Sequence, residues 1–164
     1  MKKQKQIHPI PPIIDPACTC LILGSFPSVK SREVSFYYGH PQNRFWKILA
    51  ALFDCDVPTT NEEKTKLLLD HHIALWDTIH LCLITGSSDA SIEQVIPNDI
   101  KGLIQGTSIT RIYCNGKASL KLYEKYVEKE TGIPASVLPS SSPANAAYSL
   151  EKLIMIWKEE LKRN

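Results

Sequence analysis

Aromatic and polar side chains that could hold a planar ligand are concentrated in one long segment. Residues 24–44 have the sequence GSFPSVKSREVSFYYGHPQNR and include Phe26, Tyr37 and Tyr38. Exposed rings are costly, so a long loop with several of them needs a hydrophobic mini-core beneath it or a ligand that covers it. Stacking on such rings is how proteins bind planar bases. Composition alone slightly favours the mini-core.

A second segment, residues 138–146 with the sequence LPSSSPANA, could bind an anion. Serine hydroxyls beside the free N–H groups of a helix start suit a phosphate. The alternative is plain capping, in which Ser142 caps the last helix and Pro143 occupies its first position. The bare pattern is common, and both interpretations stay open.

Two shorter polar segments follow apolar runs. Residues 86–89, Gly-Ser-Ser-Asp, could be an ordinary turn or could contact a ligand. Asn115, followed by Gly116 and Lys117, could bond the edge of a base with its amide, or could end a strand and cap a helix. The residues alone favour the cap.

The histidines and cysteines do not have the spacing of a metal site. The five histidines include no H-x-x-x-H or H-E-x-x-H pair, and the five cysteines include no C-x-x-C pair. An odd number of scattered cysteines also argues against a disulfide framework. We therefore predict no metal, no iron–sulfur cluster and no other cofactor.

Apolar runs alternate with segments of helical spacing, which predicts how these groups are positioned. The predicted strands are 19–23, 73–76, 109–114 and 136–138. The predicted helices are 41–53, 62–71, 97–105, 117–130 and 143–162. This alternation predicts a parallel sheet covered by helices on both faces. Ligand sites in such sheets lie beyond the carboxyl ends of the strands, where the polar segments fall.

Length and composition set further bounds. A chain of 164 residues with 43% hydrophobic and 22% charged residues is typical of one soluble domain. No apolar stretch is long enough to span a membrane. Residues 1–12 are basic and proline-rich, and we expect them to form a flexible tail of a cytoplasmic, monomeric protein. A net charge of +2 neither requires nor excludes a nucleic-acid partner.

Taken together, the segments resemble the uracil-DNA glycosylase superfamily, and the hypoxanthine-DNA glycosylase family within it. The matching segments follow the family's order over about 120 residues: GSFPS (24–28), FYYGHPQNRFW (36–46), LWD (75–77), GSSDASI (86–92), NGK (115–117) and LPSSSPANA (138–146). FYYGHPQNRFW is the most specific of these, LPSSSPANA supports it, and GSFPS alone is weak.

The resemblance implies a three-layer α/β/α sandwich with a four-stranded parallel sheet. It implies a monofunctional enzyme that flips a deaminated base, preferably hypoxanthine, out of DNA and hydrolyses its N-glycosidic bond to leave an abasic site. Sibling families carry an Asn or Asp in the first loop to position water. Here that stretch is Ser25-Phe26-Pro27, so the resemblance assigns the water to Asn43, with Ser25 and His40 as further catalytic candidates.

The resemblance also implies contacts to the base and to the DNA backbone. The expected base-binding residues are Phe26, Tyr37 and Tyr38 for stacking, with Ser88, Asp89 and Asn115 for the edge. The expected phosphate and wedge residues are Ser140, Ser141, Ser142, Pro143, Ala144 and Asn145. Ala144 stands where some siblings have a bulkier apolar wedge.

Three other functions remain open at this stage. One is a uracil or G/U mismatch glycosylase, which belongs to the same class. Another is a serine hydrolase that pairs Ser25 with a histidine such as His40, although the sequence has no G-x-S-x-G elbow. The third is a nucleic-acid-binding domain without catalysis.

Overall fold

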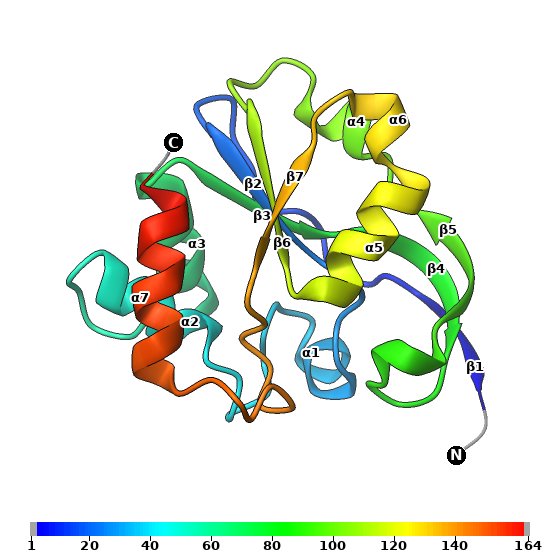
Figure 1. Ribbon diagram of the computed structural model, residues 1–164, viewed down its shortest axis with the longest axis horizontal. Coiled ribbons are helices and arrows are strands. Elements are labelled where there is room, and N and C mark those ends of the chain that lie inside the picture. Colours follow the sequence, from blue (N-terminus) through cyan, green and yellow to red (C-terminus); the bar gives the residue numbers. More distant parts are fainter. Residues whose placement is uncertain (1–2, 163–164) are drawn as a thin grey trace.

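The computed structural model describes residues 3–162, and a four-stranded parallel sheet lies at its centre (Figure 1). Its strands, in spatial order, are β3 (Ile73–Asp77), β2 (Cys20–Gly24), β6 (Arg111–Asn115) and β7 (Ala135–Leu138). All three strand pairings are parallel. Every residue of β2 is buried, as expected for a central strand that is covered on both faces.

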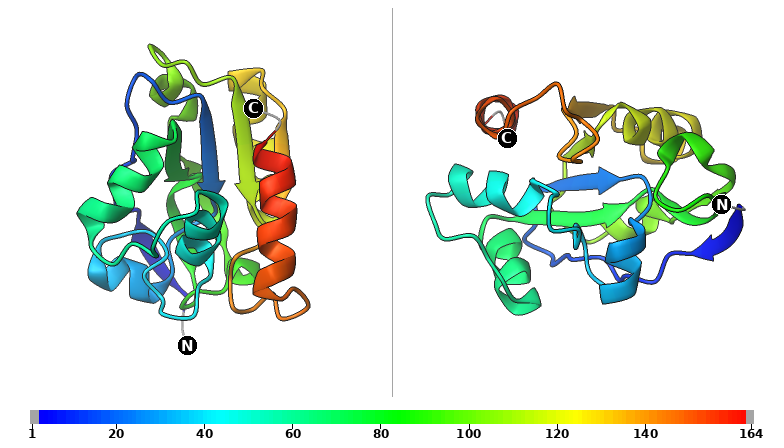
Figure 2. Two further views of the ribbon diagram at one scale, coloured as in Figure 1. Left: turned by 90° about the vertical axis from the view of Figure 1, so that its left-hand side faces the viewer. Right: turned by 90° about the horizontal axis from the view of Figure 1, so that it is seen from below.

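Helices cover both faces of this sheet and form the outer two layers (Figures 1 and 2). One face packs against α2 (Phe45–Leu52), α3 (Asn61–Asp70) and α7 (Leu150–Leu161). The other face packs against α4 (Ile100–Ile104) and α5 (Lys117–Tyr126). The predicted three-layer α/β/α sandwich is confirmed.

Alternation along β2 shows how one strand serves both layers. Ile22 belongs to the cluster that contains the fully buried Trp157 of α7, whereas Leu23 belongs to the cluster that contains Tyr123 of α5. Successive side chains of a strand point to opposite faces, so the unbroken apolar run TCLIL supplies both cores.

A second sheet, which the sequence did not predict, extends the fold on one side. It is antiparallel, with the order β1 (Gln4–Ile7), β4 (Ile79–Ile84) and β5 (Glu93–Pro97). The expected flexible tail is therefore wrong for residues 3–12, of which Gln4–Ile7 form a strand and Ile10 is 3% exposed. Backbone pairing with β4 orders this polar segment. Residues 1 and 2 of the expected tail lie outside the described part of the chain.

The last helix begins later than predicted. Residues 143–149 form a loop, and α7 starts after Ser149, whose hydroxyl accepts the N–H of Lys152. Ser142 therefore does not cap this helix, and its hydroxyl accepts the N–H of Ala144 within the loop instead. The predicted capping role of Ser142 and Pro143 is wrong.

Other helix boundaries differ from the predicted ones. The helix expected over 41–53 begins only at Phe45, after a turn. The helix expected over 117–130 breaks at Val127 into α5 and the short α6 (Glu128–Thr131). The long first loop contains a short helix, α1 (Val29–Val34), and residues 86–92 contain a 3₁₀ turn, η1 (Asp89–Ser91). Within residues 3–162, no helix is long and apolar enough to cross a bilayer.

The position of the α7 cap gives a stability prediction. Ser149→Ala removes the side-chain acceptor for the Lys152 N–H and should lower the free energy of unfolding by about 1 kcal/mol. Ser142→Ala serves as the matched control and should cost clearly less, because Ser142 lies outside the helix. Urea denaturation of both variants measures this. A larger loss for Ser142→Ala would place the cap at Ser142.

Candidate active site

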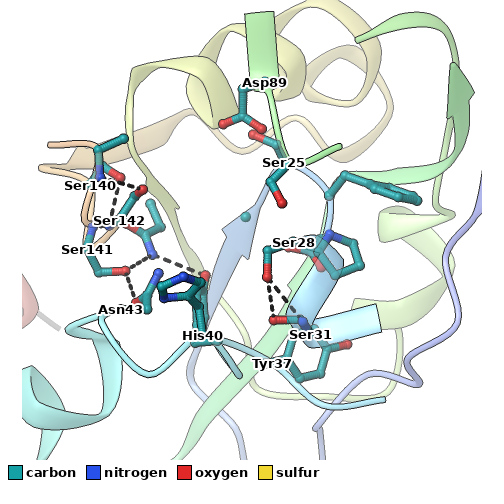
Figure 3. Close-up of a pocket in the computed structure, with 18 of the residues that line it drawn as sticks. Ser25, Ser28, Ser31, Tyr37, His40, Asn43, Asp89, Ser140, Ser141 and Ser142 are labelled. Carbon is teal, nitrogen blue, oxygen red and sulfur yellow. Dashed lines mark hydrogen bonds between the residues drawn. The ribbon is translucent and has the colours of Figure 1, made fainter. Parts of the chain in front are cut away.

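A cavity of about 380 Å³ opens at the carboxyl ends of the parallel strands. All four polar segments contribute to its wall, as the sequence predicted, although residues 86–89 follow β4 of the second sheet rather than a parallel strand (Figure 3). Its lining includes Ser25, Phe26, Tyr37, Tyr38, His40, Asn43, Asp77, Asp89, Asn115 and residues 140–144. The volume is in the range of small-ligand sites.

Asn43 has a fixed orientation at this cavity. The predicted helix over 41–53 would have included Asn43 in its first turn. In the structure Asn43 precedes α2 instead. Its Oδ1 accepts the Phe45 N–H at 3.0 Å and the Ser141 hydroxyl at 2.9 Å. A backbone N–H can only donate, so the Phe45 bond determines which end of the amide is oxygen. The side chain is thus aimed by the start of a rigid helix.

Asn115 joins three segments of the wall. Its Nδ2 donates to the Tyr38 hydroxyl at 3.1 Å and to Ser141 Oγ at 3.0 Å, and its Oδ1 accepts the Ser141 N–H at 3.0 Å. Both amide hydrogens are therefore engaged within the protein. Asn115 is a joint between β6, the first loop and the serine segment, and only one lone pair remains for the predicted contact with a base edge.

Arg44, which the sequence analysis did not select, holds the loop that carries the serines. Its guanidinium donates to the backbone carbonyls of Ser141, Ser142, Asn145 and Tyr148. The planar fork of an arginine can satisfy several carbonyls at once, which a lysine cannot. The one sequence signal for it was its place in FYYGHPQNRFW, directly after Asn43.

The serines of residues 140–142 have two different environments. Ser141 is fully buried and bonds Asn43. The hydroxyls of Ser140 and Ser142 accept backbone N–H groups, those of Ser142 and Ala144, so each keeps its own hydrogen to donate. The geometry therefore suits Ser140 and Ser142 for a phosphate contact and assigns Ser141 to the interior.

The residues predicted for the rim of the cavity also differ in whether they line it. Pro143 and Ala144 are exposed and line the cavity. Asn145 does not line it, and its side chain donates to the Ser140 carbonyl, so it holds the loop together. Ser88, expected at the base edge, is exposed and lies outside the lining, where its neighbours Ser87 and Asp89 contribute instead.

The three predicted stacking rings are not equivalent. Phe26 lines the cavity and is 8% exposed. The Tyr37 hydroxyl donates to the Pro11 carbonyl, which anchors its ring among core side chains. Tyr38 stacks on Phe45 with ring centroids 4.1 Å apart, so one of its faces is already covered. Phe26 in turn has the Arg32 guanidinium 5.4 Å from its ring centroid and His8 edge-on at 5.8 Å, so each of the three rings already has a contact within the protein.

A buried carboxylate, Asp77, forms part of the cavity lining. Its Oδ2 lies 2.7 Å from His8 Nε2, and the two side chains are 5% and 2% exposed. His8 Nδ1 accepts the Ile10 N–H, so the neutral ring carries its proton on Nε2 and donates to Asp77. Within residues 3–162, Asp77 Oδ1 has no hydrogen-bond donor. It lies against Gly24, where a Cβ would collide with it.

Sequence reasoning missed this pair for identifiable reasons. Asp77 lay in the matching LWD segment without a role, and His8 lay in the expected tail. Only the pairing of β1 with β4 brings His8 next to the end of β3.

Asp89 is the second carboxyl group of the cavity. The Ser25 hydroxyl hydrogen-bonds to it, which favours the ionised form. Asp89 lines the cavity and is exposed, but desolvation by the surrounding protein has the larger effect and, together with the nearby charge of Asp77, raises the pKa of Asp89 to about 6. The Ser25 hydroxyl thus bonds an acid, and His40 Nδ1 accepts the Gln42 N–H. A serine hydrolase needs a histidine base on its serine, so this geometry disfavours that alternative.

Arg44→Lys provides a test of how the serine loop is held. A lysine keeps the charge but cannot reach four carbonyls, so the free energy of unfolding should fall by about 2 kcal/mol, the order expected for bonds to a charged donor. Lys47→Arg on the exposed side of α2 is the control. Chemical denaturation of both variants measures the difference. Equal stability would show that the loop does not depend on Arg44.

The sequence of this chain is similar to those of two archaeal proteins. The chain is 34% identical over 140 residues to a protein named hypoxanthine DNA glycosylase from Methanosarcina acetivorans, covering 85% of this chain and 88% of that protein. It is 33% identical over 165 residues to a protein of the same name from Methanosarcina barkeri, covering 99% and 100%.

A solved structure and a family model agree with these relatives. The solution structure of a protein described as a uracil DNA glycosylase candidate from Methanosarcina acetivorans superposes with a TM-score of 0.76 at 31% identity, covering 92% of this chain and 95% of that one. The model of the uracil DNA glycosylase superfamily matches residues 11–162. The chain belongs to the uracil DNA glycosylase superfamily.

Proposed function

We propose that this protein is a monofunctional DNA glycosylase that removes hypoxanthine from DNA and leaves an abasic site. The carrying observation is a cavity in which an oriented amide, Asn43, and a buried carboxylate with an open oxygen, Asp77, line one pocket. The names of the two Methanosarcina relatives support hypoxanthine as the substrate.

The open oxygen of Asp77 accounts for base selection. Hypoxanthine carries a hydrogen on N1, which Asp77 Oδ1 can accept, whereas adenine has a lone pair on N1 that the carboxylate repels. A site built around one such acceptor discriminates strongly, because the wrong base leaves a buried charge without a donor. Phe26 covers a face of the flipped base. Flipping costs least for a base that pairs poorly, which adds selectivity for damaged sites.

Asn43 holds the hydrolytic water. Breaking the bond to the base passes through an oxocarbenium-like state, as in glycoside hydrolysis. Such an electrophile does not need a strongly basic nucleophile, so a neutral amide that positions water suffices. The bonds from the Phe45 N–H and the Ser141 hydroxyl fix the amide, and the water lies against it in the cavity.

The rim of the cavity binds the DNA backbone. Ser140 and Ser142 donate their free hydroxyl hydrogens to the phosphates beside the flipped nucleotide, and Pro143 and Ala144 occupy the space that it leaves. Within residues 3–162, the cavity lining includes no lysine, in keeping with hydrolysis by water rather than through a covalent amine intermediate. Since one chain lines the whole cavity, we propose that the enzyme acts as a monomer and that the chain is one domain.

Uracil is the second candidate substrate, because its N3–H can also donate to Asp77. An oligonucleotide panel with inosine, uracil or xanthine, scored for alkali-labile sites, ranks the substrates. Binding of lesion DNA without any abasic product would instead favour a non-catalytic binding domain.

Asn43→Ala tests the water-positioning role. Single-turnover cleavage of an inosine duplex should slow about 100-fold, the order that a positioned catalytic group contributes, while binding of the duplex persists. Asn43→Asp should retain part of the activity, because a carboxylate oxygen can also hold water. Gln42→Ala, at an exposed neighbour outside the cavity lining, is the control and should cut at the wild-type rate. A wild-type rate for Asn43→Ala would assign the water to another group.

Asp77→Asn tests base selection. The His8 Nε2–H requires an acceptor, so the new amide turns its oxygen to His8 and its nitrogen to the position of Oδ1. The pocket then offers a donor in place of an acceptor. Inosine cleavage should fall, and the affinity for an adenine-containing site relative to an inosine-containing site should rise. Competition binding measures the ratio, and thermal melting controls for the fold. An unchanged ratio would contradict base reading by Asp77.

A further inference from the structure

We propose that Asp89 is a general acid of this site and gives a proton to N7 of the departing purine. The inference rests on the proposed glycosylase function and adds a catalytic group to it. The starting point is that the cavity contains two carboxyl groups, Asp77 and Asp89, in different surroundings.

The position of Asp89 suits a group that meets the substrate. Asp89 opens the 3₁₀ turn η1, and its side chain contributes to the cavity lining. Figure 3 shows it beside Ser25, on a different side of the cavity from Ser140, Ser141 and Ser142. Ser25, a residue that is 7% exposed, lies next to the carboxyl group, and its hydroxyl lowers the pKa of Asp89 less than desolvation raises it.

The charges around Asp89 favour its neutral form. Asp77 at the end of β3, Tyr38 of the first loop and Cys82 of β4 are the titratable groups that interact with it. All three are acids, and the charge of Arg32 acts on Cys82. Bound DNA excludes water and adds phosphates, which disfavours a carboxylate still further.

The two carboxyl groups complement one edge of a purine. Asp77 has an oxygen, Oδ1, that can accept a hydrogen bond while His8 holds Oδ2, and Asp89 in its protonated form can donate one. In hypoxanthine, N1 and N7 flank the C6 carbonyl, and they offer a hydrogen and a lone pair respectively. A carboxyl group that reads the base and a second one that donates a proton divide two roles between them, as pairs of carboxyl groups do in other active sites.

The proton from Asp89 neutralises the negative charge that cleavage of the glycosidic bond would leave on the base. As the C1′–N9 bond breaks, its electron pair moves into the purine ring, and N7 takes the proton from Asp89. The base then leaves as neutral hypoxanthine rather than as an anion. Water adds to C1′ and loses a proton to the solvent, and Asp89 regains its proton from the solvent. Uracil has no N7, so this step operates only on purines.

Asp89→Asn is the test, because an asparagine has nearly the same shape but cannot transfer a proton. Single-turnover rates are measured on duplexes with inosine and with 7-deazainosine, which lacks the N7 lone pair. We expect the variant to lose about 100-fold on inosine, within the range for general acids, and less than twofold on 7-deazainosine. Asp56→Asn, at an exposed site outside the cavity lining, should match wild type on both substrates.

The pH profile gives an independent readout. A general acid acts in its protonated form, so the wild-type rate on inosine should be high below the pKa of Asp89 and should fall as the pH rises through and above about 6. The Asp89→Asn rate should lack this limb. An equal penalty on both substrates, or an unchanged pH profile, overturns the acid role. If wild type does not cleave inosine at all, the proposed function itself fails.

Discussion

The attachment of residues 139–149 to the segment before α2 is the constraint on which the site depends. Arg44 donates to four backbone carbonyls of this loop. The preceding residue, Asn43, accepts a hydrogen bond from the Ser141 hydroxyl. Asn115 completes the tie from the end of β6. Because these bonds join groups far apart in the sequence, they hold Asn43 and the serines of residues 140–142 at a constant separation.

The opposite side of the cavity depends on a different tie, through the N-terminal strand. β1 pairs with β4 and thereby places His8 against Asp77. A buried carboxylate is stable only with a donor, and the donor here comes from a segment that is polar and edge-like in sequence. His8 binds Asp77 Oδ2, so the carboxyl group in the cavity wall is held by a strand outside the central sheet.

Whether a feature could be predicted from the sequence depended on whether local residues or distant partners stabilise it. The strands 19–23, 73–76 and 109–114 were found because apolar runs buried on both faces have few alternatives, and their ends located the site. Capping was misjudged at Ser142, because the pattern Ser-Pro is equally good in a loop held by Arg44. The second sheet was missed because its edge strands, β1 and β5, are mostly exposed and show no buried apolar run. Such strands are stabilised by their partners rather than by their own composition.

The sequence by itself determined the layers of the fold, the edge of the sheet where the polar segments meet, and the motifs that resemble a DNA glycosylase. Periodicity and strand order carry that information locally. The tertiary structure alone decided which side chains remain free to act. Asn115 is committed to Tyr38 and Ser141, Ser141 is buried, and Asp77 has one open oxygen. Hydrogen-bond saturation depends on partners that are distant along the chain, so no local pattern could reveal it.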